Sequence, residues 1–212
     1  MARLINTWPV HLRHQEITLQ PFRFRDGRAW KELRRRNAEW LRPWDATLPM
    51  HDPTVPTSFS AMVRSGNRDA KQGRSLPFVI WAEGRMVGQL SIGGIAWGSL
   101  RSAYIGYWID REYAGRGIVP RAVAMAIDFS FLDLQLHRVE VNVRPENVAS
   151  LRVVDKLQLR EEGLRRRYLH IDGQWRDHRC FAMTSEERPG GVLPWLLAQS
   201  AAPESVSRAE EE

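Results

Sequence analysis

The sequence contains one cysteine and no long apolar run, and each shortage excludes a class of protein. With Cys180 alone, the chain forms no internal disulfide, which fits a reducing compartment. Charged residues interrupt every apolar run before it is long enough to span a bilayer. The first fifteen residues lack the extended apolar stretch of a secretory signal. These absences predict a cytoplasmic protein.

Signatures for metals and for common phosphate-binding loops are missing as well. The six histidines show no ligand spacing relative to one another, so no metal site is predicted. The P-loop signature G-K-[ST] is absent, and Pro120 stands where a dinucleotide fingerprint requires its third glycine. Basic strands interleaved with aromatic residues, typical of RNA-recognition domains, are not evident either.

The chain does have enough material for one domain with a sizeable core. It is 212 residues long, 43% hydrophobic and contains nine tryptophans, a composition typical of a globular protein. Its net charge of +6 is uneven, because the last ten residues carry −3 and residues 1–202 carry +9. This basic surplus suits an anionic ligand, a nucleic-acid-rich neighbourhood or simple solubility, and composition does not choose among them.

Apolar periodicity and turn residues divide the chain into an irregular arm at 1–14, one domain at 15–185 and a partly disordered tail at 186–212. Within the tail, 192–199 is predicted to form a short helix. The domain is predicted to be α/β, with a mixed sheet and helices on both faces. The predicted strands are 17–24, two within 77–95 that turn at Glu83-Gly84, 102–110, 137–143 and two within 160–184 that turn at Asp172-Gly173; the predicted helices are 26–40, with Asp26 as N-cap, 57–72, with Thr57 or Ser58 as N-cap, 116–134 and 147–157.

The stretch REYAGRGIVPRAV, residues 111–123, places two glycines directly before an apolar-periodic helix. Unpaired amide groups and a partial positive charge at a helix N-terminus favour a phosphate there. Glycine at 115 and 117 would let the backbone approach such a ligand closely. On this stretch alone, a plain turn between a strand and a helix is the simpler interpretation.

Three longer blocks favour a phosphate-binding loop over a plain turn: IGYWIDREYAGRG (105–117), LHRVEVNVRPENVASLRVVDKL (136–157) and EEGLRRRYLHIDGQWRDHRCFAMT (161–184). In this order and spacing the chain resembles the GNAT N-acetyltransferases over residues 15–185, and within them the RimJ/RimL branch. The resemblance implies the GNAT fold, an α/β architecture with a mixed, mostly antiparallel central sheet and helices on both faces. It also implies acetyl-CoA as the co-substrate, with no metal.

The resemblance implies a cofactor site as well. Backbone amides of a pyrophosphate loop would bind acetyl-CoA, and the backbone of a splayed strand would pair with the pantetheine arm and polarise the thioester carbonyl. Asn147 matches the asparagine of the family's P-E-N motif, which is expected to hydrogen-bond the cofactor arm. Asparagine is also a favourable N-cap for the helix predicted at 147–157, and the two roles are compatible. The loop falls on Gly115, Arg116, Gly117, Ile118 and Val119, and the strand segment on Tyr107, Trp108 and Ile109.

Acetyl transfer to an amine requires an acceptor for the amine proton and a proton donor for the departing thiolate. Ser150 matches the serine often proposed in the family to protonate the thiolate; a first-turn serine bonded to the backbone is the alternative. Glu140 is the first candidate for the base, because its strand lies beside the expected acetyl site; a solvated or ion-paired glutamate is the alternative. His137 and Asp177 are weaker candidates with structural alternatives.

Three positions depart from the family's pattern. Glu112 stands three residues before the first glycine of the loop, where Gln or Arg is usual. After Lys156 the chain reads Leu157-Gln158-Leu159, where x-G-F is usual. Arg167 precedes a tyrosine at a place where some relatives have an acidic residue, and this difference leaves the identity of the general base open.

On the acceptor side, Trp40 and Trp44 lie where the family's first two helices and their loop shape the acceptor groove, with a core role as the alternative for either. The arginine triplet at 34–36 is most simply a solvated surface. The triplet at 165–167 lies near the predicted mouth of the site, and both a solvated surface and an anion contact stay open for it.

The resemblance implies direct transfer of acetyl to a primary amine in a ternary complex, since Cys180 is predicted to lie in a strand away from the site. The branch implies a protein N-terminal amine, including that of a ribosomal protein, as the acceptor. The alternatives are a small-molecule amine (aminoglycoside, polyamine or amino acid), a non-catalytic basic module associated with ribosomes or RNA, and a catalytically dead acyl-CoA sensor. No DNA or membrane partner is predicted, and a homodimer is compatible with the sequence.

Overall fold

The computed structural model describes residues 8–50, 52 and 55–201, which are organised around one eight-stranded sheet. The strand order is β1-β2-β3-β4-β5-β6-β8-β7, and every neighbouring pair is antiparallel except β5 and β6, which run parallel. This is the mixed, mostly antiparallel sheet that was expected. The strands are β1 (Leu12–His14), β2 (Ile17–Pro21), β3 (Leu76–Ala82), β4 (Arg85–Ala96), β5 (Ser102–Ile109), β6 (Arg138–Val143), β7 (Arg160–Ile171) and β8 (Gln174–Thr184).

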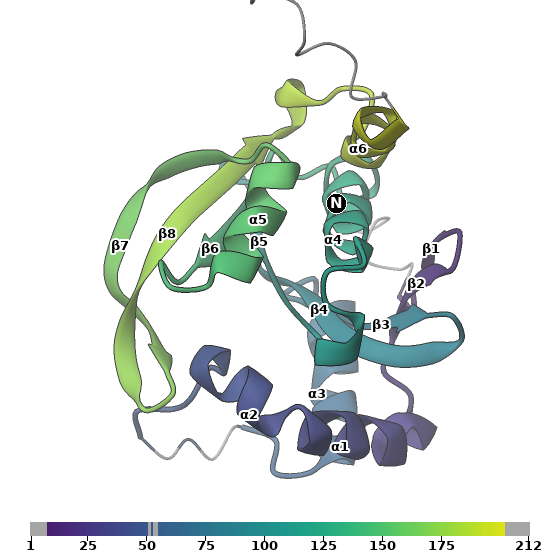
Figure 1. The fold of residues 1–212 in the computed structure, drawn as a ribbon, viewed down its shortest axis with the longest axis vertical. Helices are drawn as coiled ribbons and strands as arrows, with labels where there is room; N and C mark the ends of the chain where they lie inside the picture. Colours follow the sequence, from purple (N-terminus) through teal and green to yellow (C-terminus); the bar gives the residue numbers. More distant parts are fainter. Residues whose placement is uncertain (1–7, 51, 53–54, 202–212) are drawn as a thin grey trace, which may run out of the picture.

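Helices cover both faces of the sheet, as predicted (Figure 1). One face packs against α4, α5 and α6 in the main core, and the other packs against α1 and α3 in a smaller core. Because side chains of a strand alternate between faces, Phe78 and Ile80 of β3 enter the first core and Val79 enters the second. None of the described helices is both long and apolar enough to cross a membrane. The helices are α1 (Gly27–Arg36), α2 (Ala38–Leu41), α3 (Phe59–Lys71), α4 (Ile118–Asp128), α5 (Val148–Lys156) and α6 (Val192–Ala201).

The parallel pairing of β5 with β6 is short, and the two strands separate where it ends. Pairing joins Ser102–Tyr104 to Arg138–Glu140, while β5 continues to Ile109 and β6 to Val143. Over the same stretch β5 stays close to β4: a Cβ on Gly88 would lie 2.3 Å from the carbonyl oxygen of Trp108, so only glycine fits there. Because β5 remains attached to β4, the two parallel strands separate beyond Tyr104 and Glu140.

Several local predictions are confirmed. The Ser58 hydroxyl caps α3 by accepting a hydrogen bond from the Ala61 amide at 3.2 Å. Both predicted two-residue turns, Glu83-Gly84 and Asp172-Gly173, have positive φ at both residues and join antiparallel strands. The predicted tail helix lies within α6.

Other elements differ from the prediction. Leu12–His14, placed in the irregular arm, forms β1 and pairs with β2. The helix predicted at 26–40 breaks at Asn37 into α1 and α2. Asp26 occupies the N-cap position of α1, as predicted, but its carboxylate accepts the Arg23 amide rather than an amide of α1. The helix predicted at 116–134 is α-helical to Asp128 and then widens into a π-helix. The end of the tail, 202–212, lies outside the described residues.

Candidate active site

The separation of β5 from β6 leaves backbone groups of β5 without a strand partner. The Asp110 amide donates to the Val87 carbonyl, on the β4 side, at 2.7 Å. Because backbone direction alternates along a strand, Trp108 and Gly106 also direct their amide and carbonyl groups toward β4. Tyr107 and Ile109 therefore turn theirs toward β6, beyond the last β5–β6 pair. An extended ligand can add to such an edge by backbone hydrogen bonds. Trp108, the third predicted residue, faces β4 with its backbone.

The turn before α4 collects amide donors at one point. Gly115 and Gly117 have φ of 78° and 72°, a left-handed conformation that favours glycine, and a Cβ at either would meet nothing within 4 Å. Gly117 is the N-cap, so the amides of Ile118 and Val119 have no acceptor within the helix. Pro120, the third helical residue, has no amide hydrogen to leave unpaired. The geometry suits a pyrophosphate.

Arg116 adds a cation to the same turn. The side chain is exposed, and its guanidinium lies over the Tyr113 ring, 4.7 Å from the ring centroid. Tyr113 itself is buried in the main core. The charge is therefore held at the surface of the turn by a fixed aromatic support.

A buried polar clamp fixes the start of this turn to the break between α1 and α2. The Asp110 and Asn37 residues are 1% and 2% exposed. Asn37 Nδ2 donates to Asp110 Oδ1 at 2.9 Å, and Asn37 Oδ1 accepts the Arg111 amide at 2.9 Å. Arg36 completes the cluster by an ion pair with Asp110. The sequence analysis missed this clamp; an asparagine inside a predicted helix was its one visible signal.

Asn147 and Ser150 meet at the start of α5. Asn147 Oδ1 accepts the Ser150 amide at 3.1 Å, which confirms the predicted cap. The Ser150 side chain lies beside the Tyr107 phenol, although the two hydroxyls are not in hydrogen-bonding geometry. The phenol oxygen is buried without a partner among the described residues, and burial raises the pKa of Tyr107 well above its usual range. Ser150 is thus brought to the separated end of β5.

Glu140 is the last residue of β6 that pairs with β5, and two arginines hold its carboxylate. Arg138 Nε donates to Oε1 at 3.0 Å, and an Arg165 guanidinium nitrogen donates to Oε2 at 2.8 Å. The Cys180 sulfur lies 3.7 Å from the same Oε2. Both carboxylate oxygens therefore have cationic partners, the geometry of an ion-paired strand glutamate. The role of Glu140 as a base stays a prediction.

Cys180 lies closer to the candidate residues than the sequence analysis placed it, since it contacts Glu140. It is nevertheless 4% exposed, and burial, reinforced by the Glu140 charge, raises the pKa of its thiol. A thiol that stays protonated is a poor nucleophile, so this environment offers no route through an acetyl-cysteine.

The two weaker candidates for a base have structural partners. His137 Nε2 lies 3.2 Å from the Glu186 carboxylate, at the end of β6 away from the separated strands. Asp177 Oδ1 accepts the Arg167 amide at 2.8 Å and so ties β8 to the irregular part of β7.

The segment 40–47 forms a wall that crosses from the end of α2 to the tip of the β7–β8 hairpin (Figure 1). Trp40 Nε1 donates to the Ile109 carbonyl at 3.1 Å, which closes the end of β5. The Arg144 guanidinium lies 5.3 Å from the centroid of Trp44 and donates to the Pro43 carbonyl at 2.5 Å. Both predicted tryptophans therefore border the site, each held by a contact to a neighbouring element.

The hairpin end of this wall is fastened by backbone bonds. Ala46 forms a β-bridge with Ile171, and the Thr47 amide donates to the His170 carbonyl at 2.9 Å. The Asp172 amide donates to the Asp45 carbonyl at 3.1 Å. The wall and the hairpin tip consequently form one connected unit.

The first arginine triplet is not the solvated surface that was expected. Arg34 makes a two-pronged ion pair with Asp45, at 3.1 and 2.6 Å, and its guanidinium lies over Trp108. Arg36 binds Asp110, and only Arg35 forms an exposed pair, with Glu32. Arg34 thus positions the wall at Asp45, and Arg36 belongs to the clamp at Asp110.

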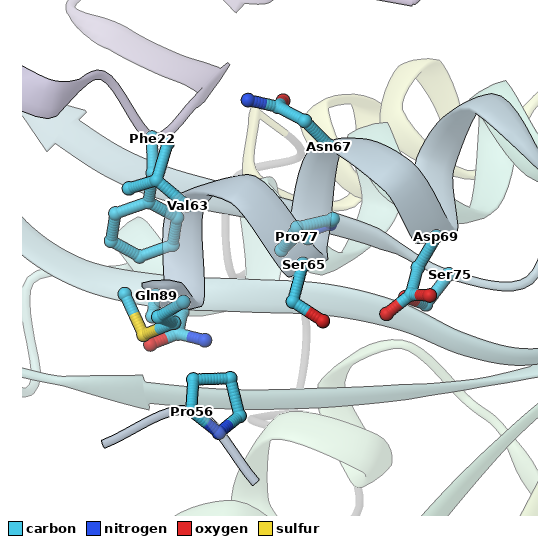
Figure 2. A pocket seen from close by; sticks show the side chains of 11 residues that line it. Phe22, Pro56, Val63, Ser65, Asn67, Asp69, Ser75, Pro77 and Gln89 are labelled. Carbon is cyan, nitrogen blue, oxygen red and sulfur yellow. The ribbon is translucent and has the colours of Figure 1, made fainter. Parts of the chain in front are cut away.

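A surface hollow of about 220 Å³ lies elsewhere, beside α3 (Figure 2). Figure 2 shows Phe22, Val63 and Pro77 on its apolar side and Ser65 and Asp69 on its polar side. None of the predicted site residues lines it. Among the residues that the structure describes, no group of three or more His, Cys, Asp or Glu side chains is placed to hold a metal ion.

Comparisons with known proteins agree with this geometry. A family model described as an acetyltransferase (GNAT) domain matches residues 16–160. The chain is 30% identical over 168 residues to the [ribosomal protein uS5]-alanine N-acetyltransferase of Escherichia coli, a match that covers 76% of this chain and 85% of that protein. It is 37% identical over 106 residues to the probable N-acetyltransferase YjcK of Bacillus subtilis, where the match spans 59% of the relative's length.

Among solved structures, RimJ of Mycobacterium smegmatis in complex with CoA-disulfide is 42% identical, with a TM-score of 0.83, covering 91% of this chain and 96% of that one. The ribosomal-protein-S5-alanine acetyltransferase of Vibrio fischeri is 25% identical, with a TM-score of 0.74. The chain therefore belongs to the GNAT family of acetyltransferases, in its RimJ/RimL-like branch, and is an acetyl-CoA-dependent N-acetyltransferase.

Proposed function

We propose that the acceptor is the N-terminal amine of a protein, and specifically of a ribosomal protein. The observation that carries this proposal is the match to an enzyme named for alanine acetylation of ribosomal protein uS5, over 85% of that enzyme's length. The wall 40–47 supports it, because this unit borders the separated strands on the acceptor side and is bounded by tryptophan and arginine side chains. Such a surface suits an extended peptide.

In the proposed reaction, the chain holds acetyl-CoA mainly by its backbone. The amides of Gly115, Arg116, Gly117, Ile118 and Val119 bind the pyrophosphate. The free backbone groups of Tyr107 and the free amide of Ile109 align the pantetheine arm, since the Ile109 carbonyl already accepts from Trp40, and an amide of this strand polarises the thioester carbonyl. Asn147 lies beside the arm while its carboxamide oxygen caps α5.

The acceptor nitrogen then attacks the thioester carbon. A free N-terminal amine has a pKa of roughly 8, so a minority is already neutral at pH 7 and needs no strong base. The carbon–nitrogen bond forms, the carbon–sulfur bond breaks, and the thiolate takes a proton, for which Ser150 is the proposed donor. Holding both substrates in line supplies much of the rate.

The test is a calorimetric titration with acetyl-CoA, followed by measurement of CoA release over a panel of peptides with different first residues. Turnover on peptides that begin with Ala or Ser is expected. Binding of acetyl-CoA with turnover on polyamines or aminoglycosides only would replace this proposal by the small-molecule alternative.

Two further predictions, the oligomeric state and the domain limits, also stay proposals. A homodimer is proposed for solution, to be tested by light scattering on a sizing column. The domain limits at 15 and 185 are proposed with one amendment, because β1 begins at Leu12 and pairs with the sheet.

A further inference from the structure

His178 lies on β8 in the half of the sheet that borders the acceptor wall. The register pairs Asn142 with Cys180, and alternate residues share a face, so the His178 side chain projects from the same face as Glu140 and Cys180. The residue is 4% exposed. Arg144, which holds the wall segment at Pro43 and Trp44, is close enough to His178 to interact with its charge. His178 thus lies under the wall.

The hydrogen bonding of the His178 ring fixes its tautomer. Nδ1 lies 3.0 Å from the Arg176 carbonyl oxygen, which can only accept, so the proton resides on Nδ1. Nε2 then carries a lone pair. Nε2 forms no hydrogen bond to any described residue, and it is not fully enclosed. It can therefore accept a hydrogen bond or a proton from a bound ligand. The edge of the Tyr168 ring, 5.8 Å away between centroids, helps to hold the orientation.

The surroundings keep the ring neutral near pH 7. Burial is the main cause that lowers the pKa of His178, and the Arg144 cation from the loop after β6 acts in the same direction. The Arg176 carbonyl opposes this through its hydrogen bond, as do the charges of Glu146, on that loop, and Asp177, on β8. From β7, Arg165 faces His178 across the strand pair, but its guanidinium is engaged by Glu140 and Tyr168.

We propose that His178, rather than Glu140, is the general base for the acceptor amine. Nε2 takes one proton from the acceptor ammonium, directly or through one water molecule, and the neutral nitrogen attacks the thioester. The second proton lost by that nitrogen replaces the one that Ser150 gives to the departing thiolate, and His178 later releases its proton to solvent. The proposal rests on the amine-acetylating function above. It also explains why Arg167 can stand where some relatives have an acidic residue, since a base on β8 makes an acidic residue at position 167 unnecessary.

The experiment compares His178→Gln with the wild type on the best peptide of the panel. Glutamine keeps a similar volume but accepts no proton at neutral pH, so kcat at pH 7 is expected to fall about tenfold, toward the rate supported by the minority of acceptor that is already neutral. The deficit should narrow toward pH 9, where the acceptor ammonium, with a pKa of roughly 8, loses its proton without help. The affinity for acetyl-CoA should stay unchanged. His11→Gln, directly before β1 on the opposite edge of the sheet, is the matched control and should keep the wild-type rate.

A second variant keeps the proposal testable if the buried substitution disturbs folding. Arg144→Gln removes the cation that lowers the pKa of His178, so the acid limb of the kcat profile should move to higher pH. A His178→Gln enzyme within threefold of wild type at pH 7, or an unmoved acid limb in Arg144→Gln, would overturn the proposal. If the wild type acetylates polyamines but no peptide, the proposed function fails, and the same variant ratios measured on the polyamine still decide the role of His178.

Discussion

The cofactor half and the acceptor half of the site are built from different chemistry. In the cofactor half, the strand end at Tyr107 and Ile109 and the turn at 115–119 present backbone groups. In the acceptor half, the wall 40–47 is held by side chains, above all by Arg34 and Arg144. Backbone donors depend on conformation, whereas side-chain clamps depend on the identity of each partner. Substitutions should therefore act differently in the two halves.

The largest effect is expected at the meeting point of the halves. Ser150→Ala removes the proposed proton donor to the thiolate and should lower kcat about 10²-fold, with little change in acetyl-CoA affinity. Ser150→Thr keeps a hydroxyl and should recover much of the rate. Steady-state CoA release checks both variants. An unchanged kcat in Ser150→Ala would reduce Ser150 to a first-turn residue of α5.

The next largest effect, a loss of stability, is expected in the buried clamp of Asn37, Asp110 and Arg36, which joins the two halves. Asp110→Ala leaves Arg36 and Asn37 without their buried partner, and we expect a loss of about 2 kcal/mol in unfolding free energy. The figure is discounted because the Arg36 side chain is 40% exposed. Urea denaturation measures it. Glu32→Ala, which breaks the exposed Arg35 pair, is the control and should leave the midpoint unchanged; equal losses in both variants would argue against the clamp.

A backbone change should affect the cofactor half alone. Gly117→Val forces a β-branched residue into φ of 72°, so the turn shifts and the Kd for acetyl-CoA should rise about tenfold, equal to about 1.4 kcal/mol. Gly84→Val is the matched control, since Gly84 has φ of 73° and an equally open surround in the β3–β4 turn. Both variants should lose similar stability, but only Gly117→Val should lose affinity. Calorimetry that finds the same affinity in both would contradict the assignment of the turn.

The smallest expected effect is on the free energy of unfolding, through the ion pairs of Glu162 with Arg138 and Arg160. Arg138, with Arg160, lowers the pKa of Glu162 from 4.5 to about 2. A carboxylate with a depressed folded-state pKa contributes stability above pH 4.5, and this contribution disappears as the pH falls through about 2. Glu162→Gln should therefore cost up to about 1 kcal/mol at pH 7, since the group is partly exposed, and nothing near pH 2. Thermal unfolding across this range is the measurement; a pH-independent difference would contradict it.

The two halves also differed in how well the sequence predicted them. Glycines at 115 and 117, the N-cap Asn147 and the two hairpin turns are local signals, and the structure has them where they were expected. The break at Asn37 and the ion pair of Arg36 were missed, because both depend on Asp110, which is distant in the sequence. Asn37 and Asp110 are 73 positions apart, and no local pattern connects them. His178 escaped notice for the same reason, since its tautomer depends on tertiary geometry.

The central claim is that acetyl-CoA binds along the free edge of β5 and at the turn before α4. Amide hydrogen exchange resolved by residue, with and without acetyl-CoA, tests it most directly. The account predicts that the ligand slows exchange at Tyr107, Ile109 and the amides of 115–119, and leaves Trp108, already bonded to β4, unchanged. Protection confined to the α3 hollow, with the turn and β5 unaffected, would contradict it.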